Sequence, residues 1–397
     1  MKLVATIYEE TFEAALRAID GVDCDMIELR AEHLGAIDLH ALRARTPKPI
    51  ILTYRGGQAP SPVQALDAGI DLIDVEWKPD LRLDIPRERV ILSHHDFKGF
   101  DLAPIPAMRA YGCAYTKLAV APRTLAENFA LLEHAKDITV IGMGEHGLFS
   151  RILAPFLGSK LTFVAATNSA APGQLTLGNA LAIYGEMRDA LYAKHIFAIA
   201  GNPAGHSLSP TIHNPLFRQH GIDAAYTIAS FETFEEIVTD KRIRGLSITA
   251  PFKEVAMKYA DRLGENARAA GAINTLVRLN DGTTFGDNTD VDGFLALIGS
   301  PKNVAIVGAG GTARAALVAC QKIGANPRVF NRSERELKSE PLENLKHFHG
   351  DLIIDTLPVA ISLPDIKTIT ARYPGGGEAL LQAQAIRQNE IFREALK

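Results

Sequence analysis

Cysteine is scarce in this chain: three occur in 397 residues, and they are Cys24, Cys113 and Cys320. They lie far apart and show none of the short spacings that zinc ligands adopt. The sequence therefore predicts neither a disulfide framework nor a metal site. So little cysteine is typical of proteins in a reducing compartment, and we expect this one in the cytoplasm.

Long apolar runs and an excess of positive charge are also missing. The uncharged stretch 161–185 is interrupted by Asn168, by Pro172-Gly173 and by Asn179, so it falls short of the about 20 continuous apolar residues that a membrane span needs. The first apolar run is too short for a signal peptide. With 42 Lys and Arg against 46 Asp and Glu, the formal net charge is −4. This balance gives no electrostatic reason to expect nucleic acid or a membrane surface as a partner.

The first half of the chain alternates short apolar, β-branched runs with amphipathic stretches. Runs of this length, separated by helical periodicity, are typical of buried parallel strands. Eight such repeats predict a closed (β/α)8 barrel of the TIM type. The expected strands are Leu3–Ile7, Met26–Arg30, Ile50–Tyr54, Leu72–Glu76, Val90–His94, Tyr115–Ala119, Thr139–Met143 and Thr162–Ala166.

The pattern restarts in the second half with the apolar run Ile196–Ala200, which leads into a loop of Gly, Asn and Pro residues. No Pro-rich or Gly/Ser-rich linker precedes it, so we place a domain boundary between Tyr192 and Ile196. A further α/β unit begins at Asn303–Val307. The length and composition are those of an ordinary globular protein with two or three domains.

Charged and polar side chains gather at the carboxyl ends of the expected barrel strands, which meet at one rim. An anionic, oxygen-rich ligand would explain such a set better than isolated structural residues, because charge beside a buried strand is costly unless it is paired. The residues concerned are Glu28, Arg30, Arg55, Glu76, His94, His95, Asp96 and Lys117.

Lys117 is the most informative of these residues, because its strand is otherwise apolar or neutral. A desolvated lysine amine can attack a carbonyl group and form an imine. The alternative is an ammonium group that is simply paired with Glu28 or Glu76. His95 could be a general base, although a histidine at such a position is often structural.

Six motifs of residues 1–190 resemble the type I 3-dehydroquinate dehydratases, in that family's order. They are DMIELR (25–30), ILTYR (51–55), VILSHHDF (90–97), TKLA (116–119), IGMGEHGLFSRIL (141–153) and AAPGQ (170–174). The resemblance implies that Lys117 is the imine lysine and that His95, rather than His94, is the catalytic histidine. It implies that substrate binds to Glu28, Arg30, Arg55, Arg151 and Gln174.

Two departures from that family are visible. The family has a glutamate between the position of Arg55 and a Gly-Gly pair, whereas here Gly56-Gly57 follows Arg55 directly. The family often has a serine where this chain has Ala170. Both changes fall near the histidine or the loop that covers the substrate, so we expect an active but slower dehydratase.

The second half contains several polar clusters that each follow a turn. Ser207 and Ser209 offer hydroxyl groups to an anion, although Ser-x-Ser-Pro is also an ordinary helix start. Lys253 ends the run GLSITAPFK, and Asp290 ends GDNTD. A lysine and an aspartate in one cleft can bind a hydroxyl group and move its proton.

The segment VAIVGAGGTARA (304–315) predicts a dinucleotide site, because a strand, a glycine turn and a helix start follow one another. An NAD site would have an acidic residue at the end of the next strand. This chain has Asn331-Arg332-Ser333 there, which favours the 2′-phosphate of NADP. A surface arginine in a turn is the alternative.

In this order the motifs of residues 195–397 resemble shikimate dehydrogenase, which implies that Lys253 and Asp290 are the catalytic pair. The implied substrate-binding residues are Ser207, Ser209, Thr249, Asn274 and Gln384. The implied NADP-binding residues are Gly308, Ala309, Gly310, Gly311, Ala313, Asn331, Arg332 and Ser333.

Together the two resemblances imply three parts: a dehydratase barrel (1–193), a shikimate-binding α/β domain (194–292) onto which a C-terminal helix (378–397) packs back, and a Rossmann-type NADP domain (293–377). The last part is shorter than in the family, so we expect its sheet to lack a strand and its nicotinamide contacts to differ.

The hypothesis is a bifunctional enzyme that converts 3-dehydroquinate to 3-dehydroshikimate and then to shikimate with NADPH. A non-catalytic sensor of the same compounds and a quinate dehydrogenase that uses NAD remain alternatives. An oligomer is possible.

Overall fold

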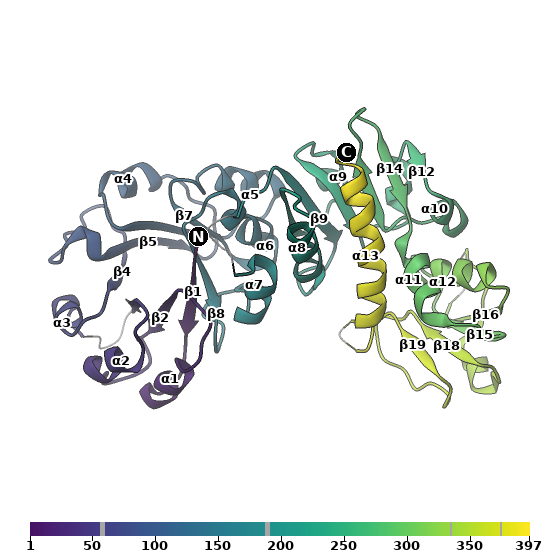
Figure 1. The fold of residues 1–397 in the computed structure, drawn as a ribbon, viewed down its shortest axis with the longest axis horizontal. Coiled ribbons are helices and arrows are strands. Elements are labelled where there is room, and N and C mark those ends of the chain that lie inside the picture. The colour runs from purple at the N-terminus through teal and green to yellow at the C-terminus, as the bar shows by residue number, and fades with distance from the viewer. Residues whose placement is uncertain (56–59, 187–190, 334–335, 374) are drawn as a thin grey trace. The chain divides into compact units, whose positions relative to one another are not determined.

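The computed structural model describes residues 1–55, 60–186, 191–333, 336–373 and 375–397 (Figure 1). The chain divides into two compact units. Unit 1 comprises Met1–Lys194 and Asp223–Phe231, and unit 2 comprises His195–Ile222 and Glu232–Lys397. Within the described ranges, no helix is long and apolar enough to cross a membrane.

Unit 1 contains eight parallel strands in the order β7-β6-β5-β4-β3-β2-β1-β8, which form a nearly closed barrel. The predicted (β/α)8 fold is therefore confirmed. The strands are β1 (Lys2–Ile7), β2 (Met26–Arg30), β3 (Ile50–Thr53), β4 (Leu72–Glu76), β5 (Val90–Asp96), β6 (Tyr115–Val120), β7 (Thr139–Gly142) and β8 (Leu161–Ala165).

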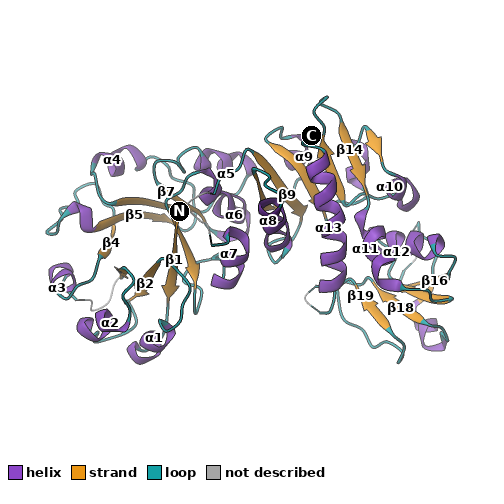
Figure 2. Cartoon of the chain, in the orientation of Figure 1, coloured by secondary structure: helices purple, strands orange, loops and turns teal. Residues whose placement is uncertain are grey.

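The helices of unit 1 lie around the outside of these strands (Figure 2). They start where the sequence offers a capping side chain: Thr11 accepts from the Ala14 amide, and Thr124 forms a capping box with Glu127. The helices are α1 (Phe12–Ala18), α2 (Leu39–Arg45), α3 (Pro62–Asp67), α4 (Ile105–Ala110), α5 (Leu125–Leu132), α6 (Gly144–Leu153) and α7 (Leu177–Tyr184).

Alternation along the strands separates two apolar clusters in unit 1. Side chains such as Val4, Ile51 and Ile91 form one cluster, and the neighbouring Ala5, Ile50 and Leu92 belong to the other, together with residues of the helices. Because strand side chains point alternately to opposite faces, both faces of each strand are buried. A further strand, β10 (Ala224–Ser230), belongs to unit 1 and packs against α6.

Unit 2 contains a mixed sheet in which β9, β11, β13, β14 and β12 are successive neighbours. β9 pairs with β11 in parallel, whereas β13 is antiparallel to both of its neighbours. The elements are β9 (His195–Gly201), α8 (Ser209–Gln219), α9 (Phe234–Thr239), β11 (Ile243–Ile248), β12 (Arg262–Leu263), α10 (Glu265–Ala270), β13 (Thr275–Arg278), β14 (Thr284–Asp287) and α11 (Thr289–Ile298).

The second sheet of unit 2 is parallel throughout and has the order β17-β16-β15-β18-β19. This order and the helix after β15 confirm the predicted Rossmann-like architecture. The C-terminal helix α13 packs against α8 and α11. The elements are β15 (Asn303–Val307), α12 (Gly311–Lys322), β16 (Asn326–Asn331), β17 (Glu340–Pro341), β18 (Leu352–Asp355), β19 (Thr368–Thr370) and α13 (Glu378–Glu394).

Candidate active sites

In unit 1, Lys117 lies on β6 and its side chain is buried. Its Nζ atom donates a hydrogen bond to Asp74 Oδ2 at 2.5 Å and lies 4.4 Å from the centre of the Phe163 ring. Lys117 therefore pairs with neither Glu28 nor Glu76, the two partners considered from the sequence. The amine is held at a defined position, shielded from water.

Asp74 is the partner that sequence reasoning missed. It lies on β4, its side chain is completely buried, and its other oxygen accepts a hydrogen bond from Arg55 Nη2 at 2.5 Å. Burial by itself would raise the pKa of Asp74, but Lys117 and Arg55 outweigh that effect and hold it well below its usual range. The one sequence signal was an aspartate inside the apolar run LIDVE.

His95 is held by Glu76 through two contacts. Its backbone amide donates to Glu76 Oε1 at 2.9 Å, and its Nδ1 atom lies 2.7 Å from Glu76 Oε2. A carboxylate at this distance assigns the proton to Nδ1, which leaves Nε2 as the basic nitrogen. The neighbouring His94 has no such contact, and its ring meets the edge of Trp77.

The electrostatic surroundings keep His95 neutral near pH 7. Burial lowers the pKa of His95, the hydrogen bond that its ring donates to Glu76 raises it, and the positive charge of Lys117 lowers it; the net shift is downward from 6.5. Phe97 stacks on the ring at a centroid distance of 5.7 Å. A neutral imidazole with a free Nε2 can accept a proton.

Glu28, Gln174 and Arg30 line the same part of the barrel. Glu28 is buried and accepts from the hydroxyl groups of Thr6 (2.6 Å) and Thr53 (2.8 Å). Gln174 Nε2 donates to the same Thr6 hydroxyl at 3.2 Å. Arg30 pairs with Glu32.

Arg151 lies on α6 and is 5% exposed. Its Nη1 atom donates to the carbonyl oxygen of Pro172 at 3.1 Å, and no carboxylate of a described residue pairs with it. Burial lowers the pKa of Arg151 to about 10. A buried guanidinium that still lacks a counter-ion is suited to bind the carboxylate of a ligand.

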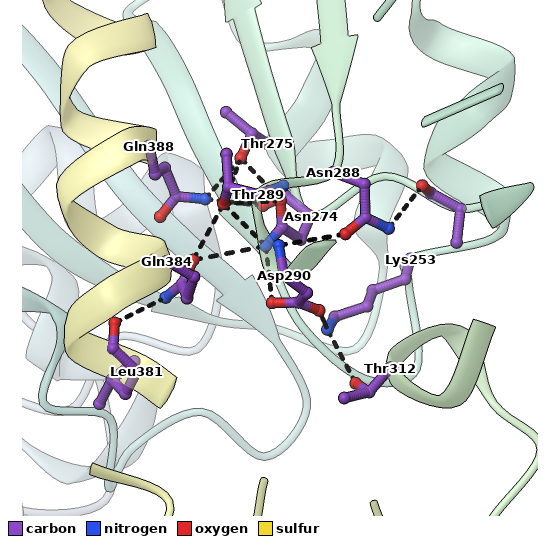
Figure 3. A network of polar contacts seen from close by, with 11 residues as sticks. Lys253, Asn274, Thr275, Asn288, Thr289, Asp290, Thr312, Leu381, Gln384 and Gln388 are labelled. Atoms are coloured by element: carbon purple, nitrogen blue, oxygen red, sulfur yellow. Dashed lines mark hydrogen bonds and ion pairs between the residues drawn. The ribbon is translucent and has the colours of Figure 1, made fainter. Parts of the chain in front are cut away.

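In unit 2, Lys253 and Asp290 form an ion pair, and both side chains are mostly buried. Lys253 Nζ also donates to Thr312 Oγ1 at 3.0 Å, so the amine lies between a carboxylate and a hydroxyl group (Figure 3). Asn274 Nδ2 donates to the other oxygen of Asp290 at 2.8 Å. The predicted pair is thus brought together from the loop after β11 and the first turn of α11, 37 residues apart in the chain.

A buried amide network surrounds this pair. Gln384, on α13, accepts from the Thr289 hydroxyl at 3.1 Å and from Asn274 Nδ2 at 3.4 Å. One turn later, Gln388 Nε2 donates to the Asn274 carbonyl oxygen at 2.9 Å and to Thr275 Oγ1 at 2.7 Å. Sequence reasoning missed Gln388 and Thr289; the signal for Gln388 was its spacing of four residues from Gln384, which puts both on one helix face.

The remaining predicted ligand-binding residues lie on neighbouring loops. Ser207 lies just before α8, and Ser209 is the first residue of that helix. Ser207 Oγ donates to Ser209 Oγ at 3.1 Å. Thr249 follows β11, and its amide donates to the Ala200 carbonyl oxygen at 2.9 Å. Gly201 allows this approach, since a Cβ there would lie 2.3 Å from Thr249 Cγ2.

The glycine turn after β15 is tight, and one side of it is open. Gly308 has φ = +110°, and a Cβ there would lie 2.4 Å from Thr356 Oγ1. A Cβ on Gly310 would meet nothing within 4 Å, so that side of the turn is open. Helix α12 starts without a side-chain cap, so its first amides are available to an anion. Ala309 and Ala313 are buried beside the turn.

The residues expected at the 2′-phosphate follow β16. Asn331 Nδ2 donates to the Ser333 carbonyl oxygen at 2.7 Å, which shapes the turn, and Arg332 and Ser333 are exposed. Of the departures seen in the sequence, Gly56-Gly57 lies outside the described residues. Among the described residues, no group of three His, Cys, Asp or Glu side chains could hold a metal ion.

Comparisons with known proteins separate the same two halves. Residues 3–190 match the model of type I 3-dehydroquinase, and residues 199–276 match the substrate binding domain of shikimate dehydrogenase. The chain is 31% identical to the shikimate biosynthesis protein AroDE of Chlamydia pneumoniae over 86% of this chain and 80% of the relative.

This chain is also similar to longer relatives and to a solved structure. The pentafunctional AROM polypeptide of Candida glabrata is 32% identical over 90% of this chain, which spans 26% of that polypeptide. The structure of dehydroquinate dehydratase and shikimate dehydrogenase from S. pombe AroM is 23% identical, with a TM-score of 0.38 over 100% of this chain and 98% of that chain.

Proposed function

Since the chain belongs to the family of bifunctional shikimate-pathway proteins that join a type I 3-dehydroquinase to a shikimate dehydrogenase, we propose that each half catalyses its family's reaction. Unit 1 would dehydrate 3-dehydroquinate to 3-dehydroshikimate, and unit 2 would reduce 3-dehydroshikimate to shikimate. The observation that carries the proposal is the buried pairing of each lysine amine with a carboxylate, Lys117 with Asp74 and Lys253 with Asp290.

In the dehydratase, the Lys117 ammonium group gives up one proton, and the resulting amine attacks the ring ketone. The carbonyl oxygen leaves as water with that proton and a second one from the nitrogen, so the protonated imine keeps the third proton and the positive charge. Asp74 therefore faces a cation before and after the step. This preorganised anion stabilises the imine as an electron sink.

His95 then performs the proton transfers. Its Nε2 atom removes a proton from the carbon next to the imine, and the proton later leaves with the ring hydroxyl as water. Glu76 holds the ring in the required tautomer. Because Glu76 lies on a barrel strand, this support does not depend on the loop glutamate that the sequence lacks.

In unit 1, the polar and charged groups around Lys117 and His95 bind the substrate. The Arg151 guanidinium binds the substrate carboxylate through parallel hydrogen bonds. Glu28, Arg30 and Gln174 contact the ring hydroxyl groups. Arg55 contributes through Asp74, to which it is already bonded.

In the dehydrogenase, Lys253 delivers a proton to the carbonyl oxygen of 3-dehydroshikimate, and Asp290 orients the amine and balances its charge. Asn274 and Gln384 bind the ring hydroxyl groups. Ser207, Ser209 and Thr249 bind the carboxylate side of the ring. Of these groups, Asn274 and Gln384 are already fixed by the amide network.

NADPH, when bound, supplies the hydride for this reduction. The open turn at Gly308–Gly311, with Ala309 and Ala313 beside it, would hold the pyrophosphate. The exposed Arg332, with Asn331 and Ser333, would hold the 2′-phosphate, which favours NADP over NAD. Comparing kcat/KM with NADPH and NADH tests this preference; equal values would support a quinate-type enzyme that uses NAD.

Two measurements test the proposal. Borohydride reduction of the full chain in the presence of 3-dehydroquinate should leave a covalent adduct that peptide mass spectrometry maps to Lys117. A coupled assay with 3-dehydroquinate and NADPH should consume NADPH. Absence of both signals would leave a non-catalytic sensor as the better description.

A further inference from the structure

We propose that Thr312 is a positioning residue that links the phosphate-binding turn to the catalytic amine of Lys253, so that cofactor binding orients the proton donor. This inference rests on the proposed dehydrogenase function. Thr312 belongs to the first turn of α12, directly after the glycine turn, and it is the second acceptor of the Lys253 amine after Asp290 (Figure 3).

The hydrogen-bonding capacity of the two groups supports this role. A lysine ammonium has three N–H donors, and here two of them are directed to Asp290 and Thr312. A third is left for the carbonyl oxygen of a substrate. The Thr312 hydroxyl accepts from Lys253, so its own proton is available to a further acceptor, and among the described residues no bond from it to an acceptor is seen.

The position of Thr312 indicates what that acceptor is. Thr312 is the second residue of a helix whose first amides are uncapped, and it follows two residues after Gly310, where the turn is open. A phosphate oxygen seated on such a turn is a strong acceptor for a neighbouring hydroxyl group. Thr312 would then donate to the cofactor phosphate while it accepts from Lys253.

Packing makes the link rigid. A Cβ on Gly311 would lie 3.2 Å from Lys253 Cβ and 3.3 Å from Lys253 Cδ, so the lysine chain lies directly against the turn. A shift of the turn on phosphate binding is therefore transmitted to the lysine. The Asp290 contact alone would leave the amine free to rotate about that carboxylate.

Removing the hydroxyl should affect both cofactor binding and catalysis. In the full-length chain, T312V should weaken NADPH binding about fivefold to tenfold and lower the kcat of the reductase about tenfold or more, as expected for a lost hydrogen bond to a charged group. T312S retains the hydroxyl and should restore both values. T239V removes an exposed hydroxyl bonded within α9 and should change neither.

A binding cycle separates the link from a structural effect. NADPH affinity, measured by nucleotide fluorescence without substrate, should fall in K253M, but K253M should cause no further loss in a T312V background. Additive losses, or unchanged affinity in T312V, would overturn the inference. If T312V loses thermal stability, T312A is measured in its place by the same cycle. A wild-type chain that binds no NADPH would instead refute the proposed function.

Discussion

The Nζ atom of Lys117 lies 2.5 Å from the Oδ2 atom of Asp74, and their side chains are 4% and 0% exposed. Such a pair is weakly screened, so each charge depends on the other. The same carboxylate binds Arg55, which gives one anion two cations. In the proposed mechanism, the amine that forms the imine is therefore held by a residue that does not itself react.

Replacing Asp74 with Asn should abolish most of the dehydratase activity. The variant leaves the buried Lys117 without its carboxylate, whereas Arg55 keeps Glu76 as a partner, so we expect destabilisation by about 3–5 kcal/mol and a loss of kcat of at least a hundredfold. Thermal unfolding and steady-state assays measure the two effects. Asp71→Asn removes a partly exposed carboxylate that pairs with Arg43 and should retain most activity. Equal activities of the two variants would contradict the role of Asp74.

Replacing Arg151 with Met should raise the KM for 3-dehydroquinate and reduce kcat/KM about tenfold to a hundredfold, because a charge-assisted contact to the substrate carboxylate is lost. The free protein should not lose stability, since no carboxylate of a described residue pairs with the buried guanidinium. Arg109→Met, which removes an exposed pair with Asp137, is the matched control. An unchanged KM in Arg151→Met would show that the carboxylate binds elsewhere.

The dehydratase should remain active below the usual pKa of histidine. Burial lowers the pKa of His95, so kcat/KM should fall only when the pH drops below the ordinary value of 6.5. The stability that this neutral ring contributes is present above 6.5 and is lost as the pH falls from there through the lowered pKa.

Glu76→Gln removes a hydrogen bond that raises the pKa of His95, so the acid limb should move further down and the rate at neutral pH should fall. Dehydratase rates of the unaltered chain and of Glu76→Gln, measured from about pH 4 to about pH 8, test this shift. An acid limb that stays in place would show that Glu76 does not act on His95.

Gln388→Leu should destabilise unit 2 without touching the reacting atoms. The Gln388 side chain forms hydrogen bonds with the hydroxyl groups of Ser247 and Thr275 and with the Asn274 carbonyl oxygen. Its loss leaves several buried polar groups unsatisfied. We expect a loss of about 2–4 kcal/mol in the free energy of unfolding and a weaker substrate affinity. Gln382→Leu, on the exposed face of α13, should have little effect in the same urea titration.

The architecture could be predicted from the sequence, because strand periodicity and glycine turns are local properties. The expected strand Leu72–Glu76 coincides with β4, and the turn at Gly308 follows β15 as expected. Candidate reactive groups could also be proposed from the sequence, since a lysine in an apolar strand and a histidine at a strand end stand out locally.

Only the tertiary structure decided which groups become partners. The sequence offered Glu28 and Glu76 as partners of Lys117, whereas the structure pairs it with Asp74, because the side chains of Asp74 on β4 and Lys117 on β6 face the same way. Likewise, Thr312 and Gln388 reach the Lys253–Asp290 pair through the packing of α12 and α13. Such pairings depend on distances between elements remote in the chain, which periodicity and local propensity do not contain.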